Sequence, residues 1–182
     1  MNLVDLAGVP PTPWKNGGGV TRELLAWPQP QDWRVRLSVA EVEADGPFSA
    51  FPGVTRWFAV LSGAGVRLDM GAHSHELTAA SEPLCFDGAA GVHCSLLGGA
   101  TQDFNLMLRG VRGRLERVRG TLDKQVDAPA LIACYAHSVR ARARFGSQEA
   151  ALAPRTLVWQ ILDQPSPVRI EGAQALWMEI AL

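Results

Sequence analysis

The chain has 182 residues, of which 47% are hydrophobic and 19% are charged, a composition typical of a globular protein. Its net charge of −1 at pH 7 excludes a strong overall field that would attract nucleic acid or an anionic membrane. Glycine and proline together contribute 30 residues (18 + 12), which predicts many turns and short strands. The length fits one domain, or two small ones that share a core.

The cysteines and the N-terminal segment indicate a cellular location. Cys85, Cys94 and Cys134 form no CxxC pair, so we expect reduced, buried thiols and neither a disulfide framework nor a cysteine zinc site. The segment MNLVDLAGVPP lacks the basic and apolar regions of a signal peptide. No apolar run approaches the roughly 20 residues of a membrane span. We therefore expect a cytoplasmic protein without a membrane partner.

Hydrophobic and polar residues alternate along much of the chain, as in half-buried strands. Residues 33–42 place apolar residues on one face and Arg34, Arg36 and Ser38 on the other. Residues 44–53 carry DG, GP and PG turn signals and predict a loop. The sequence then predicts a strand, a tight glycine turn and a strand over 55–71, with short strands within 75–80, 83–88 and 91–99.

Residues 103–110, DFNLMLRG, form the most regular predicted strand. Phe104, Leu106 and Leu108 point one way, and the opposite row is Asp103, Asn105, Met107 and Arg109. Such a polar row is ordinary on a solvent face, but in a β-barrel it can line the lumen. We expect the polar row to face a cavity and the apolar row to pack outside it.

The last third of the chain begins with a charged segment. Residues 110–128 are rich in charge and poor in large apolar residues, and we interpret them as a connection or edge ribbon between two halves. Their arginines alternate with acidic residues and lack aromatic neighbours, so we expect a solvated face and no nucleic-acid partner. About five more strands follow, and many short strands at this spacing predict a sandwich or barrel.

Two local motifs could bind a small molecule or a metal ion. In PWKNGGG, three glycines expose backbone N–H groups beside Lys15 and Asn16, which together suit a carboxylate or an amide; a flexible turn explains the glycines equally well. His73 and His75 form an HxH pair that Glu82 or His93 could complete as a metal site. A hairpin tip with polar residues explains HxH better, and we expect no metal and no other cofactor.

The sequence resembles the HutD/Ves family, through PWKNGGGVTRE, DGPFSAFPGVTR, LSGAG and DFNLMLR in that order and spacing. The resemblance runs from about residue 5 to the C-terminus and is strongest over 13–110. It implies an all-β, cupin-type fold, in which two β-barrel-like halves (residues 1–110 and 111–182) form one compact bicupin with little helix. The HxH does not belong to the pattern of this family.

The resemblance also implies a set of ligand-binding residues. They are Lys15, Asn16, Gly17, Gly18, Gly19, Thr21, Glu23, Arg36, Ser38, Arg56, Asp103, Asn105, Met107 and Arg109. Within this set we expect Lys15, Asn16, Arg36 and Arg109 to surround a small anion, because arginine offers a planar fork to a carboxylate. Glu23 and Asp103 would orient the cations.

Members of this family are associated with histidine utilisation, where they resemble a governor of the pathway rather than one of its enzymes. The expected function is therefore binding of a carboxylate such as N-formylglutamate or formiminoglutamate, without catalysis. Two alternatives remain open: a metal-free enzyme with Glu23 or Asp103 as base, and a stress-related protein-interaction module marked by a large exposed apolar patch. The sequence also leaves a homodimer open.

Overall fold

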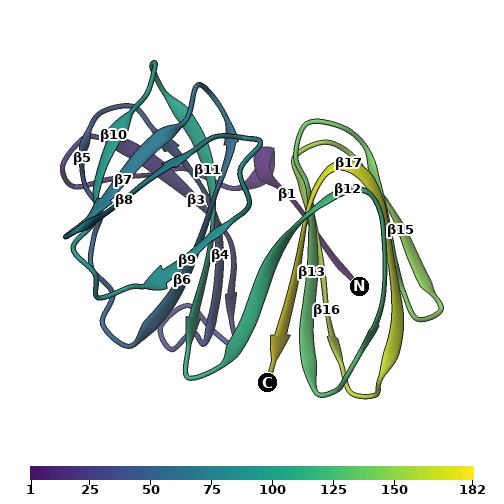
Figure 1. Cartoon of the computed structure of the whole chain (residues 1–182). Helices are drawn as coiled ribbons and strands as arrows, with labels where there is room; N and C mark the ends of the chain where they lie inside the picture. Colours follow the sequence, from purple (N-terminus) through teal and green to yellow (C-terminus); the bar gives the residue numbers. More distant parts are fainter. The chain divides into compact units, whose positions relative to one another are not determined.

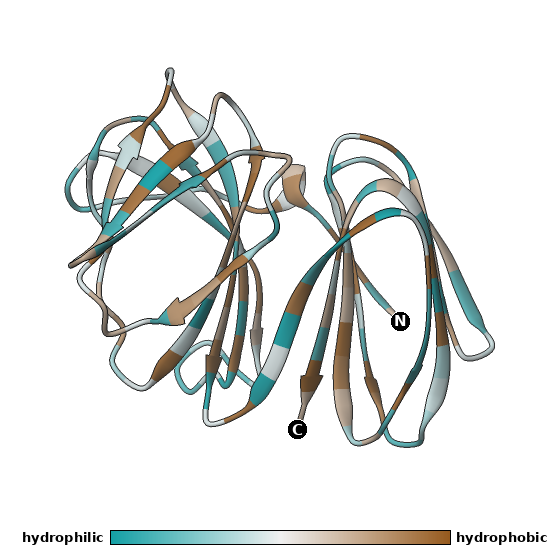
Figure 2. Ribbon diagram, in the orientation of Figure 1, coloured by the Kyte–Doolittle hydropathy of each residue, from teal (hydrophilic) through white to brown (hydrophobic).

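The computed structural model describes every residue from Met1 to Leu182 and is almost entirely β-structure (Figure 1). It contains 17 strands and one 3-10 helix, η1 (Leu6–Gly8), and neighbouring strands pair in antiparallel fashion throughout. Hydrophilic and hydrophobic residues alternate along many of the strands (Figure 2), as the sequence predicts. No helix has the length and apolar character needed to cross a membrane.

The chain divides into two compact units. One comprises Pro10–Gly110, and the other joins Met1–Val9 to Val111–Leu182. The sequence-based division into 1–110 and 111–182 therefore differs in the first nine residues. These belong with the C-terminal half because β1 (Asn2–Asp5) pairs with β16 (Thr156–Leu162), the Leu6 amide donates to the Arg155 carbonyl at 2.9 Å, and the Leu6 side chain is fully buried.

The unit Pro10–Gly110 contains two sheets. The larger has the strand order β2-β3-β4-β11-β6-β9, and the smaller has the order β5-β10-β7-β8. The strands of the larger sheet are β2 (Thr12–Pro13), β3 (Gly19–Trp27), β4 (Val35–Val42), β11 (Thr101–Arg109), β6 (Val54–Ser62) and β9 (Leu84–Asp87). Those of the smaller are β5 (Gly46–Pro47), β10 (His93–Leu96), β7 (Val66–Met70) and β8 (His73–Leu77).

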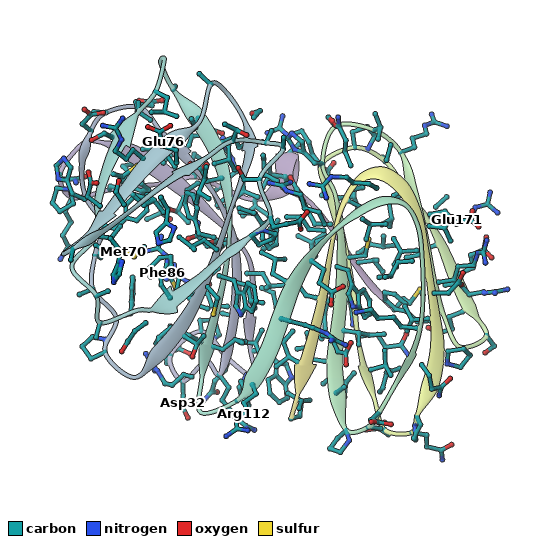
Figure 3. The ribbon with its side chains drawn as sticks, in the orientation of Figure 1. Asp32, Met70, Glu76, Phe86, Arg112 and Glu171 are labelled. Atoms are coloured by element: carbon teal, nitrogen blue, oxygen red, sulfur yellow. The ribbon has the colours of Figure 1, made fainter.

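The core of this unit lies between its two sheets. Phe58 and Val60 of β6 are buried with Val66 and Leu68 of β7 and with Cys94 of β10. Met70 and Phe86, which Figure 3 labels, pack partly buried against this cluster. One face of the six-stranded sheet therefore supplies part of the core, and the same face carries the site described below.

The second unit is a seven-stranded sheet with its own core. The strand order is β1-β16-β13-β17-β14-β15, and β12 also pairs with β17. Trp177 and Phe145 lie 6.0 Å apart, ring centre to ring centre, within a buried aliphatic cluster. The strands not yet defined are β12 (Arg112–Val126), β13 (Ala130–Ala136), β14 (Ala141–Phe145), β15 (Gln148–Leu152) and β17 (Ser166–Ala181).

Most of the charged segment 110–128 is the 15-residue strand β12, which pairs with β17 and lies at an edge of the sheet, in line with the predicted edge ribbon. Its charges form ion pairs such as Arg114–Glu179 and Lys124–Glu116. One sequence-based expectation needs correction. Cys85 is exposed rather than buried. It lies on the edge strand β9, where the alternate residues Leu84 and Phe86 face the core and Cys85 faces away.

Candidate functional site

A cavity of about 740 Å³ opens in the unit Pro10–Gly110, within the size range of small-molecule sites. One wall is a face of the six-stranded sheet, and the rest comes from the segment that follows β2 and from the segment that begins at β5. The lining residues are Thr12, Pro13, Trp14, Lys15, Asn16, Thr21, Glu23, Arg36, Ser38, Ala40, Pro47, Phe48, Ser49, Phe51, Arg56, Asn105 and Met107.

Strand register explains why polar residues from distant segments meet here. Asn105 of β11 lies opposite Ser38 of β4 on one side and Phe58 of β6 on the other, and Met107 lies between Arg36 and Arg56. Residues opposite each other in a sheet point to the same face. The alternation along each strand therefore brings Ser38, Asn105 and the two arginines onto one surface.

Arg56 is the most deeply buried cation of the cavity, with 7% of its surface exposed. Its Nε and Nη2 donate to the Asn105 side-chain oxygen at 2.9 and 2.7 Å. The guanidinium also lies over two aromatic rings, 4.6 Å from the centre of Phe48 and 5.5 Å from that of Phe86. Burial lowers the pKa of Arg56 to about 10, so it remains a cation at neutral pH.

Asp103 is a fully buried carboxyl on the same strand row as Asn105. The Thr101 hydroxyl donates to its Oδ2 at 2.8 Å, whereas Oδ1 has no hydrogen-bond partner. Burial raises the pKa of Asp103 to about 7, against the opposing effects of the Thr101 hydrogen bond and of Arg56. Asp103 does not line the cavity, and it acts there through its charge on Arg56.

The exposed part of the cavity carries more charge. The Nε of Arg36 donates to Glu23 at 2.6 Å, in a pair whose side chains are 25% and 37% exposed. Lys15 is exposed and also lines the cavity. Three cations, Lys15, Arg36 and Arg56, thus face one carboxylate, Glu23, and this excess of positive charge suits an anionic ligand.

An aromatic wall accompanies these charges. Trp14 packs edge-on against Phe48 with ring centres 6.2 Å apart, and its indole N–H donates to the Thr21 hydroxyl at 2.7 Å. Phe51 and Met107 add further apolar surface. A ligand in this cavity would therefore contact apolar groups along one side while its charged end meets the arginines.

The three glycines shape the loop beside the cavity without lining it. Gly17 has a φ of 71°, in the left-handed region that favours glycine. The Gly18 amide donates to the Asn16 side chain at 3.1 Å. A side chain at Gly19 would collide with the Glu41 carbonyl oxygen across the β3–β4 pair. The positive φ at Gly17 and the close approach at Gly19 give these two glycines a structural role.

The structure brings nine of the fourteen predicted site residues to the cavity and leaves five outside it. Those that line it are Lys15, Asn16, Thr21, Glu23, Arg36, Ser38, Arg56, Asn105 and Met107. Gly17, Gly18, Gly19, Asp103 and Arg109 do not. Arg109, expected to surround the anion together with Lys15, Asn16 and Arg36, is exposed and lies 4.4 Å from the centre of the Trp33 ring. Phe104, Leu106 and Leu108 are buried on the opposite face, as expected.

Sequence reasoning missed most of the apolar lining, including Trp14, Ala40 and Phe51. Turn signals predict a loop over the segment 44–53, and it is largely one; Phe48 and Phe51 within it fill the cavity wall. The sequence signal for this wall is the pair of aromatic residues in a segment rich in glycine and proline, because large aromatic side chains favour buried positions over a solvated loop.

The structure does not bring together the residues of the alternatives considered above: a metal site, a catalytic base and an exposed apolar patch. His73 and His75 lie on β8, with His73 exposed, and nowhere do three His, Cys, Asp or Glu side chains gather in a metal-ligating group. Neither proposed base is a free carboxylate at the cavity, since Glu23 pairs with Arg36 and Asp103 is buried behind the lining. The exposed large hydrophobic residues are Leu3, Leu97 and Val139, from separate segments.

Comparison with known sequences connects the chain to one family. The family model described as HutD matches residues 7–178. An uncharacterized 21.2 kDa protein in the hutC 3′ region of Pseudomonas putida is 37% identical over 125 residues, which is 66% of each chain. Protein Ves of Cronobacter sakazakii is 33% identical over 117 residues, 64% of this chain and 65% of Ves. The matched segments span just under two thirds of these relatives.

Solved structures agree over nearly the whole chain. The conserved protein of unknown function PA5104 from Pseudomonas aeruginosa PAO1 has a TM-score of 0.86 at 32% identity, covering 98% of this chain and 96% of that one. HutD from Pseudomonas fluorescens SBW25 has a TM-score of 0.84 at 24% identity, with coverages of 99% and 97%.

More distant likenesses identify the fold. A point mutant of Bacillus subtilis oxalate decarboxylase, a cupin-fold protein, has a TM-score of 0.62 at 8% identity, covering 98% of this chain and 76% of that one. Together with the strand content and the curled sheets, this likeness confirms the predicted all-β, cupin-type fold.

Proposed function

Because this chain belongs to the HutD family, whose model matches residues 7–178, we propose that its cavity binds a small carboxylate and that it acts as a regulator in histidine utilisation. The family relation suggests a role linked to that pathway. The ligand class we propose is N-formylglutamate, formiminoglutamate or a close relative. The protein would sense this compound rather than convert it.

The observation that carries this proposal is the state of Arg56. It is a buried cation that forms no ion pair with any protein carboxylate within 4 Å, and its two hydrogen bonds to Asn105 use Nε and Nη2. The remaining nitrogen, Nη1, donates to no protein acceptor and is available to a ligand. A buried cation without a direct anionic partner is costly, and a bound carboxylate would supply that partner through charge-assisted hydrogen bonds.

The other lining residues fit the rest of such a ligand. A formyl or formimino group needs a neutral donor and acceptor. The side-chain nitrogen of Asn16 or Asn105 can donate, and the Asn16 oxygen, which accepts one hydrogen bond from the Gly18 amide, can accept another. The Asn105 oxygen already accepts two hydrogen bonds from Arg56. A second carboxylate would meet Lys15 or Arg36 at the exposed side of the cavity. Trp14 and Phe48 would cover the hydrocarbon part that joins these groups.

Binding calorimetry with N-formyl-L-glutamate and formimino-L-glutamate tests the proposal. Removing a buried charge that pairs with the ligand costs about 2–5 kcal/mol, so Arg56→Ala should lose at least about 30-fold in affinity. Arg109→Ala is the matched control, because that arginine lies outside the cavity and should leave affinity unchanged. If folded wild type binds neither compound, or if Arg56→Ala binds as tightly as wild type, the proposed site or ligand class is wrong.

A further inference from the structure

We propose that Asp103 is a proton acceptor coupled to the cavity, which takes up a proton when an anion binds beside Arg56 and so makes ligand affinity depend on pH near neutrality. This inference rests on the proposed function and adds a means of regulating the same site. It assigns Asp103 a positioning role, since the residue reaches the ligand only through Arg56.

The surroundings of the Asp103 carboxyl do little to stabilise its negative charge. The carboxyl is fully buried, it receives one hydrogen bond from the Thr101 hydroxyl, and its Oδ1 has no partner. Buried polar atoms without partners are rare because they are costly. Protonation removes the charge and relieves that cost.

Arg56 is the cation that favours the ionised form of Asp103. Asp103 in turn exerts the largest electrostatic effect among the groups that favour the charged form of Arg56. The buried arginine thus has a single positive charge and two potential anions, Asp103 inside the protein and the ligand in the cavity. When an anionic ligand pairs with Arg56, the arginine stabilises the ionised form of Asp103 less. The negative charge of the ligand also repels the Asp103 carboxylate.

Cys94 and Arg56 itself titrate well above the range between pH 6 and pH 8. Burial raises the pKa of the Cys94 thiol on β10 to about 12, and that of Arg56 on β6 is about 10. Arg36 of β4 acts on Arg56, and Asp45 acts on Cys94. No histidine lines the cavity. A change in affinity between pH 6 and pH 8 would therefore report Asp103.

Linkage sets the sign of the effect. An anion binds best when Asp103 is already neutral, so affinity is highest below the pKa of Asp103 in the free protein, which is about 7. Above that pH each binding event must take up a proton, and affinity falls by up to tenfold per pH unit. We expect binding about tenfold weaker at pH 8 than at pH 6.

The test is calorimetry of the full chain with N-formyl-L-glutamate and with formate, at pH 6 and pH 8, in two buffers of different ionisation enthalpy. The ligand carboxyls have ordinary pKa values near 4 and stay ionised throughout. We expect an uptake approaching one proton per ligand at pH 8 and little at pH 6. In Asp103→Asn, the uptake and the pH dependence should both disappear.

A second variant covers the case in which Asp103→Asn does not fold. Thr101→Val removes the hydrogen bond that favours ionised Asp103, so the fall in affinity should begin at higher pH than in wild type. Equal wild-type affinity at both pH values with no proton uptake would overturn the inference and leave the proposed function intact. Failure of both probes to bind wild type at either pH would instead reject the proposed function, and the inference with it.

Discussion

Asn105 holds Arg56 by a single oxygen that accepts two hydrogen bonds, from Nε at 2.9 Å and from Nη2 at 2.7 Å. This contact fixes the plane of the guanidinium with a neutral acceptor. The charge of Arg56 is therefore oriented by Asn105 without being neutralised by it. A carboxylate at position 105 would do both.

Asn105→Asp is the nearly isosteric change that tests this difference. The aspartate can keep both hydrogen bonds, but it adds a negative charge in contact with Arg56 and should exclude a ligand anion. We expect the variant to remain folded and to lose more than about tenfold in affinity for N-formyl-L-glutamate, measured by calorimetry, a conservative bound for losing one charged partner. Undiminished affinity would mean that Arg56 is not the ligand's cation.

The unfolding free energy of the protein should depend on pH through the protonation of Asp103. Its pKa rises from an ordinary value of 3.8 to about 7 on folding, so the folded state holds the proton more tightly. This contribution to stability is fully present below pH 3.8 and is lost as the pH rises towards 7, at up to about 1.4 kcal/mol per pH unit.

Urea unfolding of wild type and Asp103→Asn across pH 4–8 measures this contribution. The difference in unfolding free energy between the two proteins should shift in favour of the variant as the pH rises towards 7, and then level off. A difference that stays constant across the whole range would show that Asp103 does not titrate there.

Glu23 pairs with Arg36, so under the proposed function it would compete with a ligand anion, and its removal should strengthen binding. Glu23→Gln deletes the only carboxylate of the cavity lining, so we expect anion affinity to rise severalfold at low salt, with a smaller gain at high salt. The Glu23–Arg36 pair is partly exposed, and such pairs contribute about 0–1 kcal/mol to stability, so the unfolding midpoint should change little. Weaker binding in this variant would instead make Glu23 a ligand contact.

The glycine loop offers a purely structural prediction. Gly19→Ala places a Cβ against the Glu41 carbonyl oxygen, and relieving such a clash by moving backbone costs about 1–3 kcal/mol. Gly91→Ala is the control in the same unit, because a Cβ there meets nothing within 4 Å. Thermal unfolding should separate the two variants by several degrees. Equal melting temperatures would show that the β3–β4 pair adjusts freely.

Period-two alternation was enough to predict the strands that build the cavity wall. In β11 it placed Asn105 and Met107 on the cavity face and Leu106 on the other, and the structure agrees. Alternation fixes only the face of a strand. It does not show where along the strand the cavity ends, and for that reason it also predicts Asp103 and Arg109, on the same row, at a cavity that neither residue lines.

The aromatic wall could not be derived in the same way. Trp14, Phe48 and Phe51 reach the cavity from segments outside the central strands, where side-chain direction depends on turns rather than on a period. The position of β1 was equally inaccessible, because Asn2–Asp5 is a short strand whose partner lies in the last third of the chain. Pairing between strands so far apart in the chain produces no local sequence pattern.

That pairing has a consequence for the order of events as the polypeptide leaves the ribosome. Residues 10–110 contain every strand of their own two sheets. β1 precedes them, yet its hydrogen-bonding partner β16 emerges only after residue 156. Until then β1 lacks its partner strand, and a deletion of β1 would leave the edge of β16 open, the kind of edge through which β-proteins aggregate.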